Sequence, residues 1–251
     1  MNRNKLSLSA FFFLCGLCVY AQNVGRLEIP NSPPALKGQL IEHIGYTTSY
    51  NADLLIPNWV AYELTLDEAS GDYPRKGSFC PDPDVLGRSA TTYDYSNSGW
   101  DRGHMAPAAD MKWSETSMKE SFYLSNICPQ DRSLNSGQWN TIEEAVRRWA
   151  RQSGSVYVVC GPIIQEGYST IGSNQVAVPA SFFKVVLRKD DGEWSAIGFV
   201  FPNQQCSGSP YEYACTVDQV EEITGLDFFY QLPDEIENRI ESVCNVKVWN
   251  R

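Results

Sequence analysis

Histidine is scarce in this chain, because His43 and His104 are the only two among 251 residues. This scarcity disfavours a zinc site, since no CxxC motif outside the first 21 residues supplies thiolates in place of imidazoles. The chain also lacks internal repeats, low-complexity tracts and any Pro/Gly/Ser linker long enough to separate two domains. With 43% apolar residues, its length suffices for one sizeable core, and we expect a single domain.

Positive charge is also scarce. The 20 lysines and arginines face 30 aspartates and glutamates, so the net charge is −10. Nucleic-acid-binding proteins usually carry a basic surface, and this composition therefore disfavours tight, processive binding to DNA. It still permits a hydrolase that releases its substrate, provided that a local basic cleft and a bound cation attract the phosphate.

The beginning of the chain has the pattern of a secretory signal peptide. Arg3 and Lys5 precede an apolar stretch, residues 6–19, and Ala21 ends a small-x-small cleavage site. The apolar stretch is shorter than the roughly 20 residues that a membrane-spanning helix needs. We therefore expect a secreted or periplasmic protein with no membrane contact after cleavage. The expected parts are a signal peptide at 1–21, an extended arm at 22–40 and a single domain at 41–251.

Six cysteines follow the expected signal peptide, and an even number is compatible with disulfides in an exported protein. Cys206 and Cys215 bracket a Gly/Ser/Pro loop and are the favoured local pair. Cys128 and Cys160 lie in apolar stretches, which is typical of buried thiols.

Apolar and β-branched runs separated by turn residues predict the secondary structure. Because strands dominate the middle of the chain without regular alternation with helices, we predict an α+β fold with a central, largely antiparallel sheet flanked by helices. The expected strands cover residues 45–50, 59–65, 155–160, 180–188 and 194–201. The expected helices cover residues 114–122 and 135–151, a segment opened by a capping box at Thr216 and closed by Gly225, and residues 234–243.

The most informative segment is the DRGH tetrad, residues 101–104, which follows a turn-rich aromatic stretch at residues 93–100. His104 is suited to activate water, because an unperturbed imidazole titrates near pH 6.5 and is largely an unprotonated base at neutral pH. For a histidine considered alone, the alternative is a hydrogen-bonded core residue.

Asn135 is the candidate metal ligand, since Mg²⁺ keeps most of its waters and accepts few protein oxygens. The alternative is that Asn135 caps the N-terminus of a helix beginning there. Glu143 lies within roughly 80° of Asn135 around a helix and is placed to orient water near a metal. Arg147 follows Glu143 at i+4, which favours a simple ion pair within the helix.

Two arginines are candidates for neutralising charge on a phosphate, because the guanidinium group matches phosphate geometry. They are Arg102 and Arg88, and for both the alternative is a surface salt bridge in an acidic protein. Asp101 is expected in a tight turn, where it organises the loop rather than binding metal.

Three segments, in this order and at these separations, resemble the DNA/RNA non-specific endonucleases, a family with a ββα-metal active site. They are the DRGH tetrad, residues 126–130 (NICPQ) and residues 134–139 (LNSGQW) followed by Glu143. The similarity extends from about residue 41 to residue 243.

This resemblance implies that Asn135 holds one Mg²⁺ or Mn²⁺ ion and that His104 is the general base. Hydrolysis in that family releases the 3′ oxygen, leaves 5′-phosphate ends, and tolerates both DNA and RNA of any sequence. The implied contributors to charge stabilisation are Arg88 and Arg102, and Asn126 and Glu143 match positions that support the metal and the histidine. We count Glu143 with the catalytic residues and expect Asp101 and Arg147 only to support the site.

We therefore expect a secreted, metal-dependent endonuclease that acts on DNA and RNA. One alternative is a non-catalytic exported binding protein on the same scaffold, which the acidic composition favours. The other is a narrower phosphodiesterase or ribonuclease. The sequence does not predict the oligomeric state.

Overall fold

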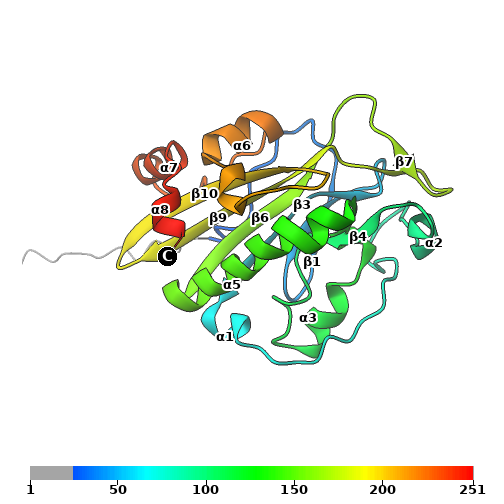
Figure 1. The fold of residues 1–251 in the computed structure, drawn as a ribbon, viewed down its shortest axis with the longest axis horizontal. Coiled ribbons are helices and arrows are strands. Elements are labelled where there is room, and N and C mark those ends of the chain that lie inside the picture. Colours follow the sequence, from blue (N-terminus) through cyan, green and yellow to red (C-terminus); the bar gives the residue numbers. More distant parts are fainter. Residues whose placement is uncertain (1–24, 251) are drawn as a thin grey trace, which may run out of the picture.

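The computed structural model describes residues 25–250, so the predicted signal peptide lies outside the described part of the chain. The centre of the protein is a seven-stranded antiparallel sheet (Figure 1). In spatial order, its strands are β1 (Gln39–Glu42), β2 (Thr47–Asn51), β3 (Ile56–Thr65), β6 (Ser155–Ile163), β9 (Ser181–Asp190), β10 (Glu193–Pro202) and β11 (Ala214–Cys215).

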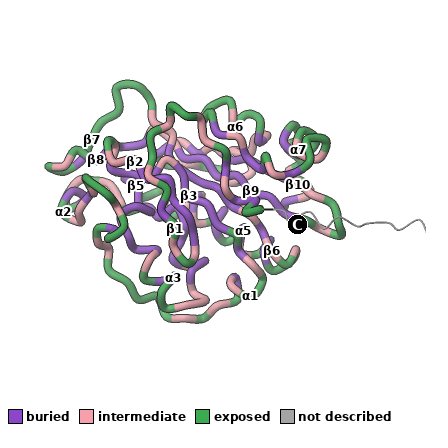
Figure 2. The backbone as a smooth tube through the Cα atoms, turned by 180° about the vertical axis from the view of Figure 1, so that it is seen from behind, coloured by how far each residue is buried: buried purple, intermediate pink, exposed green. Residues whose placement is uncertain are grey.

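Strand β3 shows why both faces of this sheet are covered. Val60 and Tyr62 belong to one apolar cluster, whereas Trp59 and Ala61 belong to another. Because successive side chains of a strand point to opposite faces, the sheet separates two cores. Figure 2 accordingly shows the long strands as buried interior and the connecting loops as exposed rim.

Helices cover each face of the sheet. Helix α5 (Asn140–Ser153) contributes Val146 and Trp149 to the cluster that contains Val60. Helices α6 (Val217–Thr224) and α7 (Asp234–Glu241) contribute Val220 and Ile240 to the opposite cluster. The predicted α+β fold with a flanked antiparallel sheet is confirmed. The other helices are α1 (Leu66–Ala69), α2 (Thr92–Tyr95), α3 (Glu115–Glu120), η1 (Leu124–Asn126), α4 (Arg132–Leu134), η3 (Pro210–Tyr213) and α8 (Val246–Trp249).

A second, two-stranded sheet carries the DRGH tetrad. Strand β4 (Asp101–His104) pairs in antiparallel register with β5 (Ile127–Gln130), and a helical segment follows directly. This segment comprises α4, the π-helical turn η2 (Asn135–Trp139) and α5, with non-helical backbone at Gly137. The three parts form a ββα unit. The expected tight turn at Asp101 is wrong, because Asp101 begins strand β4 and pairs with Gln130.

Other local predictions can be compared directly with the structure. Thr216 caps α6 through the expected capping box, and Gly225 ends that helix in a left-handed conformation with φ of 70°. The thiols of Cys128 and Cys160 are fully buried, as expected. The predicted pairing of Cys206 with Cys215 is wrong, because both are free thiols.

Residues 25–38 run along the sheet without forming a strand before β1. Leu27 is nonetheless buried in the cluster under α6 and α7, and the backbone of Asn31 exchanges two hydrogen bonds with that of Asp227. A third, short sheet is formed by β7 (Thr170–Ile171) and β8 (Val176–Ala177). Among residues 25–250, none of the helices has the length and apolar character needed to cross a membrane.

Candidate active site

A cavity of about 400 Å³ opens beside the ββα unit and combines residues from several parts of the chain. Strand β4 provides Arg102 and His104, the π-helical turn provides Asn135, and α5 provides Glu143. The loop between α1 and α2 adds Arg75 and Phe79. The structure thus brings together four of the residues that the sequence singled out.

His104 lies in an apolar part of this cavity. Its side chain packs against Phe79 and Phe122, with ring centroids 5.3 and 5.2 Å away, and the residue is 8% exposed. The Nε2 atom has no hydrogen-bond partner among the described residues. Burial, assisted by the positive charge of Arg75, lowers the pKa of His104 to about 3. The imidazole is therefore neutral at physiological pH and has a free nitrogen.

Asn126 fixes the backbone next to His104. Its Oδ1 atom accepts a hydrogen bond from the backbone N–H of Ala106 at 2.8 Å, and its Nδ2 atom donates to the carbonyls of Ala106 and Ser121. Asn126 is fully buried, so these three bonds satisfy an amide that would otherwise be costly to bury. The side chain holds two segments of the connection between β4 and β5 in one conformation.

Asn135 is not the N-terminal cap of its helical segment. The helical segment begins at Arg132, and the carboxylate of Asp131 accepts hydrogen bonds from the backbone N–H groups of Ser133 and Leu134. This arrangement rules out the capping alternative. The Asn135 Nδ2 atom instead donates to Asp101 Oδ2 at 3.2 Å. Because a carboxylate only accepts, this contact orients the amide and leaves Oδ1 without a donor among the described residues.

Glu143 is buried in the same cavity and belongs to a network of charged side chains. Burial raises the pKa of Glu143 to about 8, an effect that the nearby Lys184 opposes and that Asp110 reinforces. The expected ion pair between Glu143 and Arg147 is wrong, because Arg147 Nη1 lies 2.6 Å from Asp110 Oδ1. Asp110 is fully buried and accepts a second hydrogen bond from Tyr62 Oη, which draws Arg147 towards it.

Lys184 is a component of this network that the sequence did not reveal. It is fully buried in β9, its Nζ atom lies 4.4 Å from the centre of the Trp139 ring, and that atom has no hydrogen-bond partner within residues 25–250. A single lysine in an apolar strand does not indicate a functional site in the sequence. Lys184 comes close to Glu143 only because β9 packs against α5 in the folded protein.

The arginines divide into two groups. Arg102 is exposed at the rim of the cavity, where its guanidinium lies 4.7 Å from the centre of the Phe79 ring. Arg75 lines the same cavity, and the only sequence signal for it was the basic pair that it forms with Lys76 in an irregular loop. Arg88 does not line the cavity and donates to the backbone carbonyl of Asn174.

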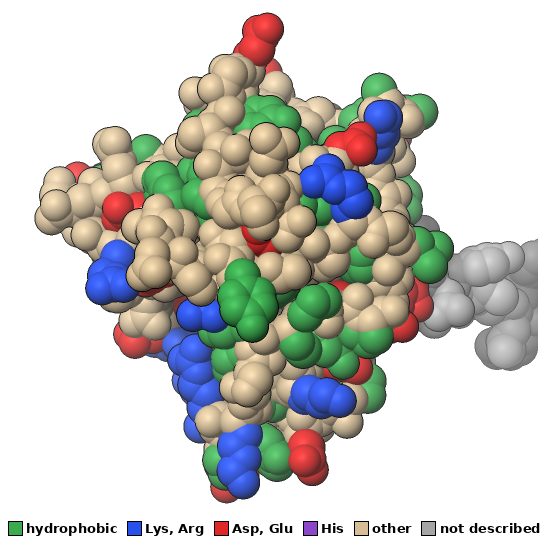
Figure 3. All heavy atoms as spheres, turned by 90° about the vertical axis from the view of Figure 1, so that its right-hand side faces the viewer, with side chains coloured by type: hydrophobic (Ala, Val, Ile, Leu, Met, Phe, Trp, Pro, Cys, Tyr) green, Lys and Arg blue, Asp and Glu red, His purple; other side chains and the backbone are tan. Residues whose placement is uncertain are grey.

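A second hollow adjoins this cavity, and Arg102 lines both. It is bordered by the aromatic stretch before the tetrad and by Arg132, whose Nε atom lies 3.2 Å from Asp101 Oδ1. Figure 3 shows the face at the α2 and β7 end of the molecule, where Lys and Arg side chains are spread among uncharged and acidic ones. Arginine side chains thus line both hollows in a chain whose net charge is −10.

The donor set fits a hard divalent cation. The unengaged Asn135 Oδ1 atom and the Glu143 carboxylate are oxygen donors, and both residues line one cavity. Magnesium commonly binds through one or two protein oxygens and completes its shell with water and phosphate oxygens. The cavity offers that chemistry without a cluster of carboxylates.

Comparison with known proteins places this chain among nucleases. A family model described as DNA/RNA non-specific endonuclease matches residues 23–235. "Nuclease EXOG, mitochondrial" of Homo sapiens is 36% identical over 222 residues, which are 81% of this chain and 60% of the relative. "Endonuclease G, mitochondrial" of Homo sapiens is 35% identical over 205 residues, covering 76% and 69%. A solved structure titled as the EndoG/EndoGI complex has a TM-score of 0.75 at 32% identity, covering 80% of this chain and 90% of its own.

Two consequences follow from these relatives. The chain spans less than two thirds of the human EXOG sequence, 60% of its length. The predicted secreted or periplasmic location is wrong, since the relatives in man, frog and fission yeast are named mitochondrial nucleases. That prediction rested on residues 1–21 alone, whereas the similarity to these relatives extends over more than 200 residues.

Proposed function

Because the chain belongs to the DNA/RNA non-specific endonuclease family, we propose that this cavity hydrolyses phosphodiester bonds of DNA and RNA in a metal-dependent reaction. One observation supports this above all others. A neutral, unpartnered imidazole, that of His104, lines the same cavity as the free amide oxygen of Asn135 and the guanidinium of Arg102. These are a base, an oxygen donor for a cation and a positive charge for a phosphate.

In the proposed reaction, His104 accepts a proton at Nε2 from the attacking water. Asn135 would hold a Mg²⁺ or Mn²⁺ ion through Oδ1, and Asp101 keeps the amide oriented by accepting a hydrogen bond from Nδ2. The cation would supply neutralisation of the developing charge and of the leaving 3′ oxygen. Asn126 keeps the backbone beside His104 in place, and Glu143 orients water at the cavity wall. Release of the 3′ oxygen leaves a 5′-phosphate end.

Charge on the phosphate is met by arginines at the rim. Arg102 and Arg75 lie where non-bridging oxygens of the substrate would approach, and guanidinium groups bind such oxygens in pairs. Arg88, bound to the Asn174 carbonyl, would contribute only if that hydrogen bond were exchanged for a phosphate. Contacts of this kind carry no sequence information, which agrees with cleavage of either nucleic acid at any sequence. Arg147 acts indirectly, by neutralising Asp110 beneath Glu143.

The pH dependence of the reaction should differ between free enzyme and enzyme–substrate complex. In the free protein, the lowered pKa of His104, about 3, keeps the base unprotonated well below pH 6.5. A bound phosphodiester anion favours the protonated imidazole and therefore raises this pKa in the complex. The acid limb of kcat/KM should thus lie at lower pH than the acid limb of kcat, and initial rates between about pH 2.5 and pH 8 measure both. Coincident limbs near pH 6.5 would contradict this account.

The proposed function is tested by incubating purified residues 22–251 with supercoiled plasmid, single-stranded DNA and total RNA. We expect all three to be degraded in Mg²⁺ or Mn²⁺ and none in EDTA, with 5′-phosphate ends on the products. Degradation of RNA alone would favour the narrower ribonuclease. A folded protein that cleaves none of the substrates with either metal would favour a non-catalytic binding protein.

A further inference from the structure

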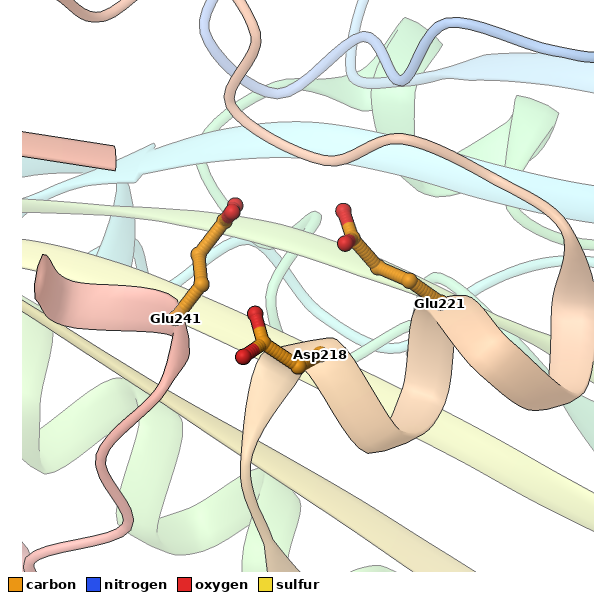
Figure 4. A group of neighbouring side chains, drawn as sticks. All are labelled: Asp218, Glu221 and Glu241. Atoms are coloured by element: carbon orange, nitrogen blue, oxygen red, sulfur yellow. The ribbon is translucent and has the colours of Figure 1, made fainter. Parts of the chain in front are cut away.

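A group of carboxylates lies apart from the cavity, between helices α6 and α7. Asp218 and Glu221 stand on successive turns of α6, and Glu241 is the last residue of α7. Each offers an oxygen atom within 4.8 Å of the other two. Figure 4 shows the three side chains converging on one space between the helices.

The Glu241 carboxylate is the most unusual member of this group. The residue is 5% exposed, and its Oε1 atom is buried without a hydrogen-bond partner in the described chain. It also ends a helix, where the backbone carbonyls form the negative pole of the helix dipole. A buried anion in this position is unfavourable unless a cation is close.

No described lysine or arginine neutralises the group. None of the three carboxylates forms an ion pair within residues 25–250, and Arg239, the basic residue in the last turn of α7, pairs with Glu193 instead. Glu221 has one partner, the backbone N–H of Phe228, which binds Oε1 at 2.8 Å. Burial raises the pKa of Glu241 to about 9 and that of Glu221 to about 7, and neighbouring carboxylates add to both shifts.

We propose that Asp218, Glu221 and Glu241 form a calcium site that joins α6 to α7. Calcium–oxygen distances are about 2.3–2.6 Å, so ligand atoms on opposite sides of one ion are separated by up to about twice that length. The limit of 4.8 Å among the three carboxylates agrees with a single shared ion. Calcium also accepts several carboxylates and irregular geometry, whereas magnesium prefers to keep its waters.

The ion would act on the structure rather than on the reaction. Helices α6 and α7 cover one face of the sheet through Val220 and Ile240, and a shared cation would hold these helices together above it. Because the carboxylates must lose protons to bind the ion, binding near neutral pH would release protons to the buffer.

The test is titration of CaCl₂ into EDTA-treated protein by isothermal calorimetry, together with Tm measurements. If the dissociation constant is on the order of 0.1 mM, as in weaker calcium modules, about 5 mM calcium should raise Tm by about 5 °C or more. Glu241→Gln and Glu221→Gln should each abolish the calcium-dependent rise in Tm. In calorimetry, each variant should bind one calcium ion fewer per protein molecule than wild type. Glu222→Gln, the same change on the exposed neighbour, should leave both unchanged.

A further variant separates this site from the proposed nuclease site. Asn135→Ala should retain the calcium-dependent rise in Tm, because Asn135 lies in the other cavity. A calcium shift of equal size in wild type and Glu241→Gln would overturn the proposal, as would the absence of calcium binding to wild-type protein. Both results are independent of whether the protein cleaves nucleic acid.

Discussion

Replacing His104 by alanine should lower kcat by roughly 10² to 10⁴, the usual contribution of a general base. The side chain that would accept the proton disappears, while Arg102, Arg75 and Asn135 still line the cavity. KM for plasmid DNA should therefore change much less than kcat. Steady-state cleavage of a defined duplex and of an RNA oligonucleotide in saturating Mg²⁺ measures both parameters.

The experiment must distinguish the loss of the base from the loss of packing that the same substitution causes. His104 fills space between Phe79 and Phe122, so alanine leaves a void that glutamine would largely fill. His104→Gln should retain the Tm of wild type more closely than His104→Ala and be similarly inactive. If either folded variant cleaves at the wild-type rate, His104 is a structural residue and another base must be sought.

The second histidine illustrates why the assignment falls on His104. The His43 Nε2 atom lies 2.9 Å from Asp82 Oδ2, and the same carboxylate oxygen accepts a hydrogen bond from Ser125. His43 is thus engaged in a buried polar contact and does not line the cavity. Of the two imidazoles in the sequence, only that of His104 combines a cavity position with an unpartnered nitrogen.

The strands of the main sheet could be predicted from the sequence because both faces of the sheet are buried. Burial on both faces requires apolar side chains at successive positions along each strand. In β9, residues 181–190, Phe182 and Val186 face one core while Phe183 and Val185 face the other, and such continuous apolar runs read as strands. The capping box at Thr216 is a similarly local signal, because every partner lies within four residues. These features depend on neighbours in the chain.

The missed features depend on partners that are distant in the chain. Strand β4 is polar and only four residues long, so its pairing with β5 more than 20 residues later left no periodic pattern. Arg147 was assigned to Glu143 by helical spacing, yet the buried carboxylate of Asp110 competes for it across 37 residues. Lys184 and Arg75 entered the site for the same reason, through tertiary packing rather than motif.

The contact between Asp101 and Asn135 is the feature of the site that the tetrad alone could not explain. Sequence reasoning gave Asp101 a role in a turn and left Asn135 divided between cap and metal ligand. In the structure, Asp131 is the cap and Asp101 orients the Asn135 amide. Asp101, the first residue of the tetrad, therefore orients the proposed metal ligand, and His104, the last residue, is the proposed base.

Asn135→Ala should consequently lower activity and weaken its dependence on Mg²⁺ together. Loss of Oδ1 removes the oriented oxygen donor, and we expect the Mg²⁺ concentration for half-maximal activity to rise by roughly 10² or more, because even outer-sphere partners of metals contribute 10- to 100-fold. Excess Mn²⁺ should restore part of the rate. Activity measured as a function of metal concentration, with Tm recorded for each variant, provides the test.

Asp131→Ala is the matched control, since it removes the side chain that caps the helical segment and leaves the Asn135 amide in place. It should reduce the free energy of unfolding by about 1 kcal/mol and Tm by about 2–4 °C, with an unchanged Mg²⁺ titration. The reverse pattern, in which Asn135→Ala lowers only Tm, would assign Asn135 a structural role. Because the two residues share one helical segment and differ in what their oxygens contact, this pair of variants separates helix stabilisation from metal binding.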